Sequence, residues 1–255
     1  MSLLHACKVS KRYGGLQALD DISFEVEQGE IFGLIGPNGA GKTTLFNLLT
    51  GSERADNGHF MLGGERLPAG PPHAVARCGI ARSFQNTRLF RELSVLENAM
   101  VAADARARTG LWATLAGTRA ARAEEAACRA SALRWLDYVG IAHLADAAAG
   151  TLSYGDQRRL EIARALAGQP RLLALDEPAA GMNATETGVL KRLLERIRAD
   201  GVTIVLIEHD MSLVMAACDR IAVLDFGRLI AQGTPAAVRH DPVVIAAYLG
   251  GSHAR

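Results

Sequence analysis

Short apolar runs, bounded by turns rich in Gly, Asp and Asn, recur in the first and last thirds of the chain. Runs of this length between turn residues predict strands. In the last third a helical pattern separates each run from the next, and this alternation predicts a parallel sheet with helices on its faces. We expect strands at 3–9, 21–26, 31–35, 58–62, 172–176, 203–207 and 220–225.

The pattern changes between Gln85 and Ser153, where alanine, arginine and leucine predominate and no strand signal is present. Ser94 and Glu97 have the spacing of a capping box, which opens a helix. The Gly- and Thr-containing segment 109–118 is expected to form a turn between helices. We therefore predict one domain over 1–255, in which 1–85 and 153–255 form an α/β core and 86–152 is an inserted helical subdomain.

The composition argues against several classes of protein. The 255 residues are 49% hydrophobic with a formal net charge of +1, so no overall charge attracts nucleic acid or an anionic membrane. The cysteines have neither CxxC nor CxxxH spacing, which argues against structural zinc. No run of about 18 apolar residues and no signal-peptide pattern is present, so we expect a cytoplasmic protein that does not itself cross a membrane.

A glycine-rich segment, GPNGAGKTT, lies between an apolar run and a helical pattern and matches the phosphate-loop motif G-x-x-x-x-G-K-[ST]. Its glycines let successive N–H groups converge on phosphates at the start of a helix. Lys42 is expected to reach the β- and γ-phosphates, and the Thr43 hydroxyl to ligate Mg²⁺. The predicted nucleotide-binding residues are Gly36, Pro37, Asn38, Gly39, Ala40, Gly41, Lys42, Thr43 and Thr44.

Two further apolar strands end in residues suited to hydrolysis. Asp176 ends one of them and is expected beside Mg²⁺, whereas Glu177 projects differently and can polarise an attacking water. His209 follows the next strand, where it can sense the γ-phosphate. A surface histidine would be the simpler interpretation in isolation, but the order of these strands after the phosphate loop favours a catalytic role.

Two more residues give weaker signals. Gln85 follows a short strand before the predicted insertion, where its amide can contact Mg²⁺ or water; alone it would be an ordinary polar loop residue. Tyr13, in KRYGG, can stack on adenine, although a single tyrosine is more often a core or surface residue.

The segment LSYGDQRRLEIAR places Ser153 and Gly155 at the start of a predicted helix, where hydroxyl and N–H groups can face a phosphate. Lys42 already belongs to a complete phosphate site more than a hundred residues earlier. Two phosphate-facing sites for one nucleotide are explained if two chains share it.

Tyr13, GPNGAGKTT, Gln85, LSYGDQ, LLALDEP, AAGMN and IEHD together resemble the ATP-binding subunits of ATP-binding-cassette transporters. The resemblance covers the whole chain. It implies an α/β P-loop NTPase core with a mostly parallel sheet, an N-terminal antiparallel β part and an inserted α-helical subdomain. It also implies a head-to-tail dimer in which ATP lies between the phosphate loop of one cassette and Ser153, Tyr154, Gly155 and Asp156 of the other.

The resemblance further implies roles for individual residues. Glu177 would be the catalytic base, His209 the switch residue, and 180–183 the loop that crosses to the opposite site. Thr43, Gln85 and Asp176 would hold Mg²⁺. The helical subdomain and Gln85 would contact a membrane-embedded permease, which places the chain peripherally at the cytoplasmic face of the inner or plasma membrane.

A narrower resemblance, carried by IARSFQNTRLFRELSVLENAMVA, QRRLEIARAL, IEHDMSLVM and VIAAYLG, is to the longer type of branched-chain amino acid uptake ATPase. It implies integral membrane permeases, a second cassette and, indirectly, a periplasmic solute-binding protein as partners. ATPases for urea, other amides or lipopolysaccharide export remain alternatives. A soluble ABC ATPase for DNA repair or ribosomes would carry coiled-coil insertions, zinc motifs or paired cassettes, and the near-neutral charge does not favour nucleic acid as a partner.

The chain departs from the family pattern at Asp156, where glutamine is usual, and Tyr154 replaces a common glycine. Asp156 is either the third helical residue of a capping box begun by Ser153, or a carboxylate that repels the ATP of the partner cassette. Asn183 and Ala184 also differ from the common aspartate and proline, which affects only the geometry of communication between the two sites.

Overall fold

The computed structural model describes residues 1–83, 89–104 and 118–250. The chain divides into two compact units, of which the first contains Met1–Arg82 and Arg171–Arg255 and the second Ser83–Pro170. No helix among the described residues is long and apolar enough to span a membrane.

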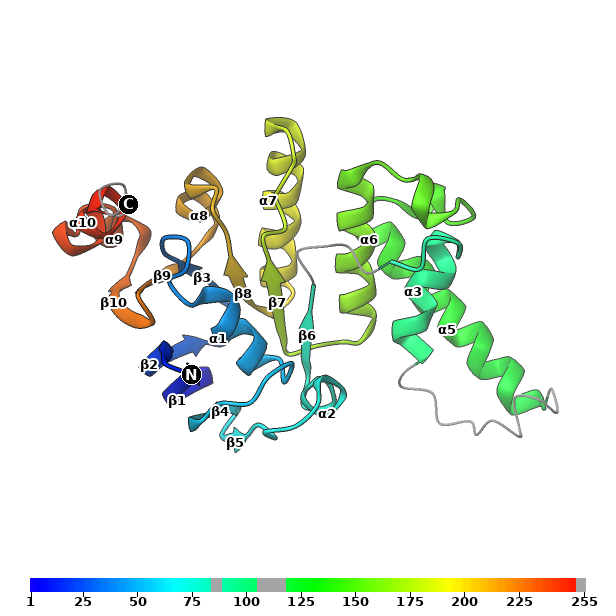
Figure 1. Ribbon diagram of the computed structural model, residues 1–255. Helices are drawn as coiled ribbons and strands as arrows, with labels where there is room; N and C mark the ends of the chain where they lie inside the picture. The colour runs from blue at the N-terminus through cyan, green and yellow to red at the C-terminus, as the bar shows by residue number, and fades with distance from the viewer. Residues whose placement is uncertain (84–88, 105–117, 251–255) are drawn as a thin grey trace. The chain divides into compact units, whose positions relative to one another are not determined.

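The first unit contains a parallel sheet with strand order β10-β9-β3-β8-β7-β6 (Figure 1). All neighbouring pairs are parallel except β10 and β9 at one edge. Every residue of β3, β7 and β8 is buried, as expected for parallel strands covered on both faces. The strands are β3 (Ile31–Ile35), β6 (Ile80–Arg82), β7 (Leu172–Asp176), β8 (Thr203–Ile207), β9 (Arg220–Asp225) and β10 (Arg228–Gly233).

A second, antiparallel sheet has the order β2-β1-β4-β5. Its strands are β1 (Ser2–Tyr13), β2 (Leu16–Glu27), β4 (Asn57–Leu62) and β5 (Glu65–Arg66). Buried side chains of both sheets meet those of α1 (Lys42–Leu49) in one hydrophobic core, so α1 is held between the sheets (Figure 1). The expected α/β fold with an antiparallel N-terminal part is confirmed, as are the expected strands, which differ from the observed ones only in their ends.

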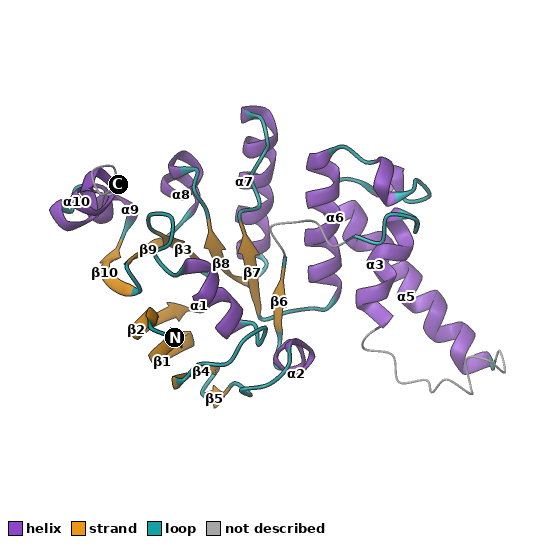
Figure 2. Ribbon diagram, viewed as in Figure 1, coloured by secondary structure: helices purple, strands orange, loops and turns teal. Residues whose placement is uncertain are grey.

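The remaining helices of this unit are coloured purple in Figure 2. They are α2 (Pro72–Arg77), α7 (Ala184–Ala199), α8 (Met211–Ala217), α9 (Pro235–Arg239) and α10 (Pro242–Gly250). Asn183 caps the start of α7 in a full capping box that includes Glu186, and Asp210 caps the start of α8 by accepting bonds from the amides of residues 212 and 213. These caps fix the residues at which the loops after β7 and β8 end and the next helices begin.

The second unit is built from α3 (Val95–Asp104), α5 (Arg119–Tyr138) and α6 (Tyr154–Ala167), which contact one another. Short 3₁₀ turns at Ala142–Leu144 and Ala149–Thr151 connect α5 to α6. The predicted capping box before α3 is confirmed, because the Glu97 carboxylate accepts from the Ser94 amide at 2.7 Å and Ser94 Oγ from the Glu97 amide at 3.1 Å. This compact unit, Ser83–Pro170, includes α6. The helical insertion that we expected at 86–152 ends before α6, and its bounds stay a prediction.

Candidate functional site

The phosphate-loop segment connects β3 to α1 and is shaped by two glycines. Gly36 has a φ of 150°, and a Cβ built there would lie 2.1 Å from the Leu224 carbonyl oxygen. Gly41, which precedes the first residue of α1, has a φ of 102°, and its Cβ would lie 2.7 Å from the Ala18 carbonyl oxygen. The loop therefore follows a path that larger residues cannot take.

Lys42 begins α1 and is 6% exposed. Its Nζ donates to the carbonyl oxygens of Gly36 at 2.7 Å and Pro37 at 2.9 Å. Burial lowers the pKa of this ammonium, and the Glu177 and Asp176 carboxylates oppose that shift. The phosphate loop and the two acidic residues are thus electrostatic neighbours.

The outer part of the loop faces solvent. Asn38, Gly39 and Thr43 are exposed, and a Cβ on Gly39 would meet no atom within 4 Å. The first backbone N–H groups of an α-helix have no partner within that helix, and they carry the positive end of its dipole. An open glycine loop, a buried ammonium and the start of a helix fit the phosphates of a nucleotide.

Asp176, at the end of β7, is one of the few buried charged residues. Its Oδ2 accepts a bond from Arg82 Nη2 at 2.9 Å, and Arg82 ends the neighbouring strand β6. The sequence alone assigns no role to Arg82, because only the pairing of β6 with β7 brings it to Asp176.

Glu177 follows Asp176 with a φ of 48°, in the left-handed region that non-glycine residues seldom adopt. Its amide donates to the Ile207 carbonyl at 2.9 Å, which continues the ladder between β7 and β8. This conformation costs on the order of 1–3 kcal/mol, and such strain concentrates at functional sites. The Glu177 Oε1 lies 2.9 Å from Nε2 of His209, which follows β8.

Glu208, which precedes His209, is a second residue whose role was not predicted from the sequence. It is buried, and its carboxylate accepts from the amides of Ala179 at 2.7 Å, His209 at 3.1 Å and Asp210 at 3.4 Å. Burial raises its pKa, while these amides and the Glu177 charge have smaller effects. Glu208 therefore joins the loops that follow β7 and β8.

Tyr13, at the end of β1, is 44% exposed. Its hydroxyl donates to Glu53 and also lies within hydrogen-bonding reach of Thr44 in the first turn of α1. Burial, followed by the Glu53 carboxylate, raises the pKa of the Tyr13 hydroxyl. The exposed ring thus lies next to the phosphate-loop helix.

The LSYGDQ segment lies in the helical unit. Ser153 caps the start of α6, and its Oγ accepts from the Asp156 amide at 3.2 Å and donates to Asp156 Oδ2 at 2.6 Å. Arg159 pairs with the same carboxylate. Gly155 is buried, whereas Tyr154 is exposed and its hydroxyl accepts from Arg158 Nη2 at 2.6 Å. Ser153 therefore caps α6 at the Asp156 amide, while the Asp156 carboxylate bonds the Ser153 hydroxyl, so the structure shows one half of the expected capping box.

Lys42, Asp176, Glu177 and His209 thus come together at one edge of the parallel sheet, and Tyr13 lies beside the adjoining helix. Gln85 lies outside the described residues. The described residues contain no group of three or more His, Cys, Asp or Glu side chains suited to holding a metal by themselves. A cation at this edge would depend on hydroxyl and phosphate oxygens in addition to Asp176.

This fold and this set of residues define an ATP-binding cassette. The sequence profile described as "ABC transporter" matches residues 19–180. The chain belongs to this family, as a cassette that binds and hydrolyses ATP. A second profile, described as "Branched-chain amino acid ATP-binding cassette transporter", matches residues 228–254.

The chain is 46% identical to BraF of Pseudomonas aeruginosa, a high-affinity branched-chain amino acid transport ATP-binding protein, over 97% of the chain and 98% of BraF. Its identity to LivG of Escherichia coli K12, which has the same description, is also 46%, with the same coverage. LptB, the lipopolysaccharide export ATP-binding protein of that strain, is 37% identical over 98% of both chains. Among solved structures, the ADP conformation of the cassette MJ1267 has a TM-score of 0.85 and 31% identity over 98% of this chain and 99% of that one.

Proposed function

We propose that this chain is the ATP-hydrolysing subunit of an importer for branched-chain amino acids. The observation that carries the proposal is the agreement between the whole-length identity of 46% to BraF and LivG and the separate C-terminal profile at residues 228–254. The identity of 37% to LptB makes lipopolysaccharide export the weaker candidate.

For ATP hydrolysis, the backbone N–H groups of residues 38–44 and the Lys42 ammonium bind the β- and γ-phosphates. Thr43 and Asp176, with Gln85, hold Mg²⁺, which when bound neutralises charge on the phosphate oxygens. Lys42 loses its bonds to the Gly36 and Pro37 carbonyls as it turns to the phosphates. Tyr13 supports the adenine ring.

Glu177 takes a proton from the attacking water, which is worth about 10²–10⁴-fold in rate. The 2.9 Å contact with His209 supports this assignment because it orients the carboxylate toward the residue that we assign to sensing the γ-phosphate. A second cassette supplies Ser153, Tyr154, Gly155 and Asp156 to the same nucleotide. Closure of that dimer on ATP, and its release after hydrolysis, drives the permease.

The helical subdomain and Gln85 contact the permease at the cytoplasmic face of the membrane, and a periplasmic binding protein delivers the amino acid. The test is to purify the chain with its membrane partners, reconstitute the complex in vesicles, and measure ATP-dependent uptake of leucine, isoleucine, valine and urea. We expect uptake of the three amino acids and its loss in Glu177→Gln. Uptake of urea alone would contradict the substrate assignment, and the absence of any membrane partner would favour a soluble ABC ATPase.

A further inference from the structure

Five side chains of the first unit form a continuous hydrogen-bonded path from the predicted adenine residue to the predicted metal carboxylate. The Tyr13 hydroxyl donates to Glu53, which also accepts from Asn47 Nδ2 at 2.8 Å. Arg82 Nη1 donates to Asn47 Oδ1 at 2.8 Å, and Arg82 Nη2 to Asp176 Oδ2 at 2.9 Å. The path therefore runs along α1 and then crosses to β7.

Arg82 is the branching point of this path. Besides Asn47 and Asp176 it contacts Thr50 Oγ1, at 2.9 Å from Nη1, and its guanidinium lies 5.5 Å from the centroid of the Phe46 ring. Three of its partners thus belong to α1 or to the residue that ends it. The two nitrogens of the planar fork bind α1 on one side and Asp176 on the other, which an ammonium at a single point cannot do.

The pair is enclosed. The Arg82 side chain is 10% exposed and that of Asp176 is 5% exposed. A buried ion pair by itself is weak evidence for stability, because desolvation offsets the Coulomb attraction. Removing one member, in contrast, leaves the other charge buried without compensation. The orientation of the Asp176 carboxylate therefore depends on Arg82.

We propose that Arg82 is a positioning residue of the hydrolysis site, which fixes the Asp176 carboxylate relative to the helix that carries Lys42 and Thr43. This inference rests on the proposed role of Asp176 at Mg²⁺. Partners that orient a metal-binding side chain typically change metal affinity or activity by about 10–100-fold when they are removed. Arg82 acts on the metal-dependent part of nucleotide binding, and not on the contacts that Lys42 and the loop amides make with phosphate.

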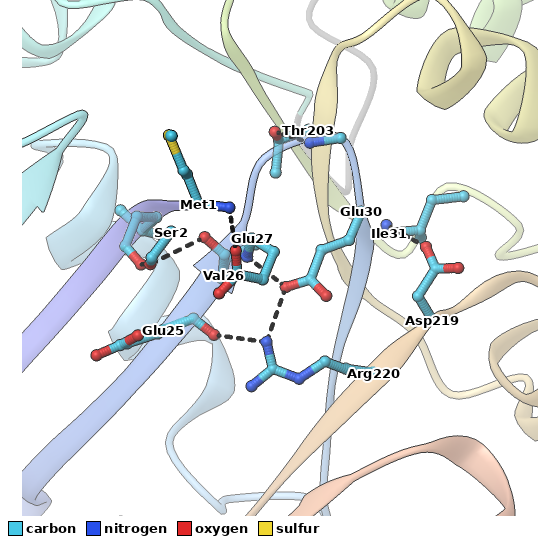
Figure 3. A network of polar contacts seen from close by, with 12 residues as sticks. Met1, Ser2, Glu25, Val26, Glu27, Glu30, Ile31, Thr203, Asp219 and Arg220 are labelled. Carbon is cyan, nitrogen blue, oxygen red and sulfur yellow. Dashed lines mark hydrogen bonds and ion pairs between the residues drawn. The ribbon is translucent and has the colours of Figure 1, made fainter.

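The chain provides a matched control at the opposite ends of the strands in the same sheet. Arg220, the first residue of β9, pairs with the buried Glu30 at 3.2 Å (Figure 3). Its guanidinium also lies 5.7 Å from the centroid of the Phe32 ring. This pair has the same chemistry, a buried carboxylate with an arginine against an aromatic ring, but it lies at the starts of the strands. The predicted site residues follow the strand ends.

The test is calorimetric binding of a non-hydrolysable ATP analogue to the isolated chain, in EDTA and over a series of Mg²⁺ concentrations. For Arg82→Leu we expect the affinity in EDTA to stay within about twofold of the parent, and the Mg²⁺ concentration for half-maximal enhancement to rise about 10–100-fold. Arg220→Leu lowers the melting temperature without moving that concentration. An unchanged Mg²⁺ dependence in Arg82→Leu, or an equal shift in both variants, would overturn the proposal.

If Arg82→Leu does not fold, Arg82→Lys carries the test. The lysine keeps the charge beside Asp176 but cannot also bind Asn47 and Thr50, so we expect a smaller rise of severalfold in the same Mg²⁺ concentration. No shift in a folded Arg82→Lys chain contradicts the proposal. Because these measurements involve neither a permease nor an amino acid, a failed transport assay would leave them unaffected, and the two hypotheses fail separately.

Discussion

His209 Nε2 and Glu177 Oε1 lie 2.9 Å apart, although the two residues belong to different strand ends. Their proximity follows from the parallel pairing of β7 with β8, in which Asp176 is opposite Ile207. Glu177 lies one residue beyond the end of β7, and His209 lies two residues beyond the end of β8. The contact orients the Glu177 carboxylate, which we assign to the attacking water, toward His209, which we assign to the γ-phosphate.

Glu177→Gln tests the assignment of the base. The amide keeps the size of the side chain but cannot take a proton, so we expect the ATPase rate to fall by about 10²–10⁴-fold while ATP still binds. Trapped ATP should stabilise the dimer, which size-exclusion chromatography with ATP would detect. Glu195→Gln, a change in an exposed carboxylate of α7, is the control and should leave both measurements unchanged. Hydrolysis at the parental rate in Glu177→Gln would show that another group is the base.

The parallel sheet could be predicted because its central strands are continuous apolar runs, as in Ile31–Ile35, Leu172–Asp176 and Thr203–Ile207. The edge strand β10 was not predicted, because Arg228–Gly233 is only partly buried and lacks such a run. The two-residue β5 gives no periodic signal at all. Edge strands lose the hydrophobic pattern on which the prediction depends.

Lys42, Asp176, Glu177 and His209 could be predicted from their places after apolar strands. Arg82 and Glu208 could not, because their roles depend on contacts between distant segments. Arg82 is 94 positions from Asp176, and only the pairing of β6 with β7 brings them together. Glu208 reaches the amide of Ala179, which is 29 positions away. Local sequence does not specify which of several charged residues takes such a place.

Lys42→Met separates nucleotide binding from folding. Burial lowers the pKa of the Lys42 ammonium, so its charge destabilises the folded state at every pH below the lowered pKa. That cost decreases as the pH rises through the lowered pKa toward the ordinary value. At neutral pH we therefore expect the neutral methionine variant to melt at the same temperature as the parent or higher, while it loses ATP binding. Calorimetric titration and thermal unfolding measure the two effects; retained ATP binding would contradict the phosphate-loop assignment.

Glu208 predicts a pH dependence of stability. Its pKa is raised in the folded state, so between its ordinary value and the raised one the folded chain holds more protons than the unfolded chain. The contribution of Glu208 to the free energy of unfolding therefore falls as the pH rises through that window, by about 1.4 kcal/mol for each pH unit that separates the two pKa values.

The glutamine of Glu208→Gln cannot ionise. The free energy of unfolding of the parent minus that of the variant should therefore decrease as the pH rises from about 4.3, the ordinary glutamate pKa. Urea unfolding at a series of pH values measures this difference. A difference that is constant with pH would mean that Glu208 titrates alike in both states.

Asp156→Gln tests whether the departure from the family signature affects the shared nucleotide. In the structure the Asp156 carboxylate accepts a hydrogen bond from the Ser153 hydroxyl at 2.6 Å and pairs with Arg159. The substitution removes a negative charge near the ATP of the partner cassette, where repulsion is on the order of 1 kcal/mol at an effective dielectric near 20. We expect the ATP concentration for half-maximal hydrolysis to fall by roughly two- to fivefold, with folding intact. Glu97→Gln, which changes the carboxylate that bonds Ser94 at the start of α3, is the control for the loss of a carboxylate at a helix start and should leave that concentration unchanged. If Asp156→Gln changes neither the ATP dependence nor the maximal rate, Asp156 acts only as a cap for α6.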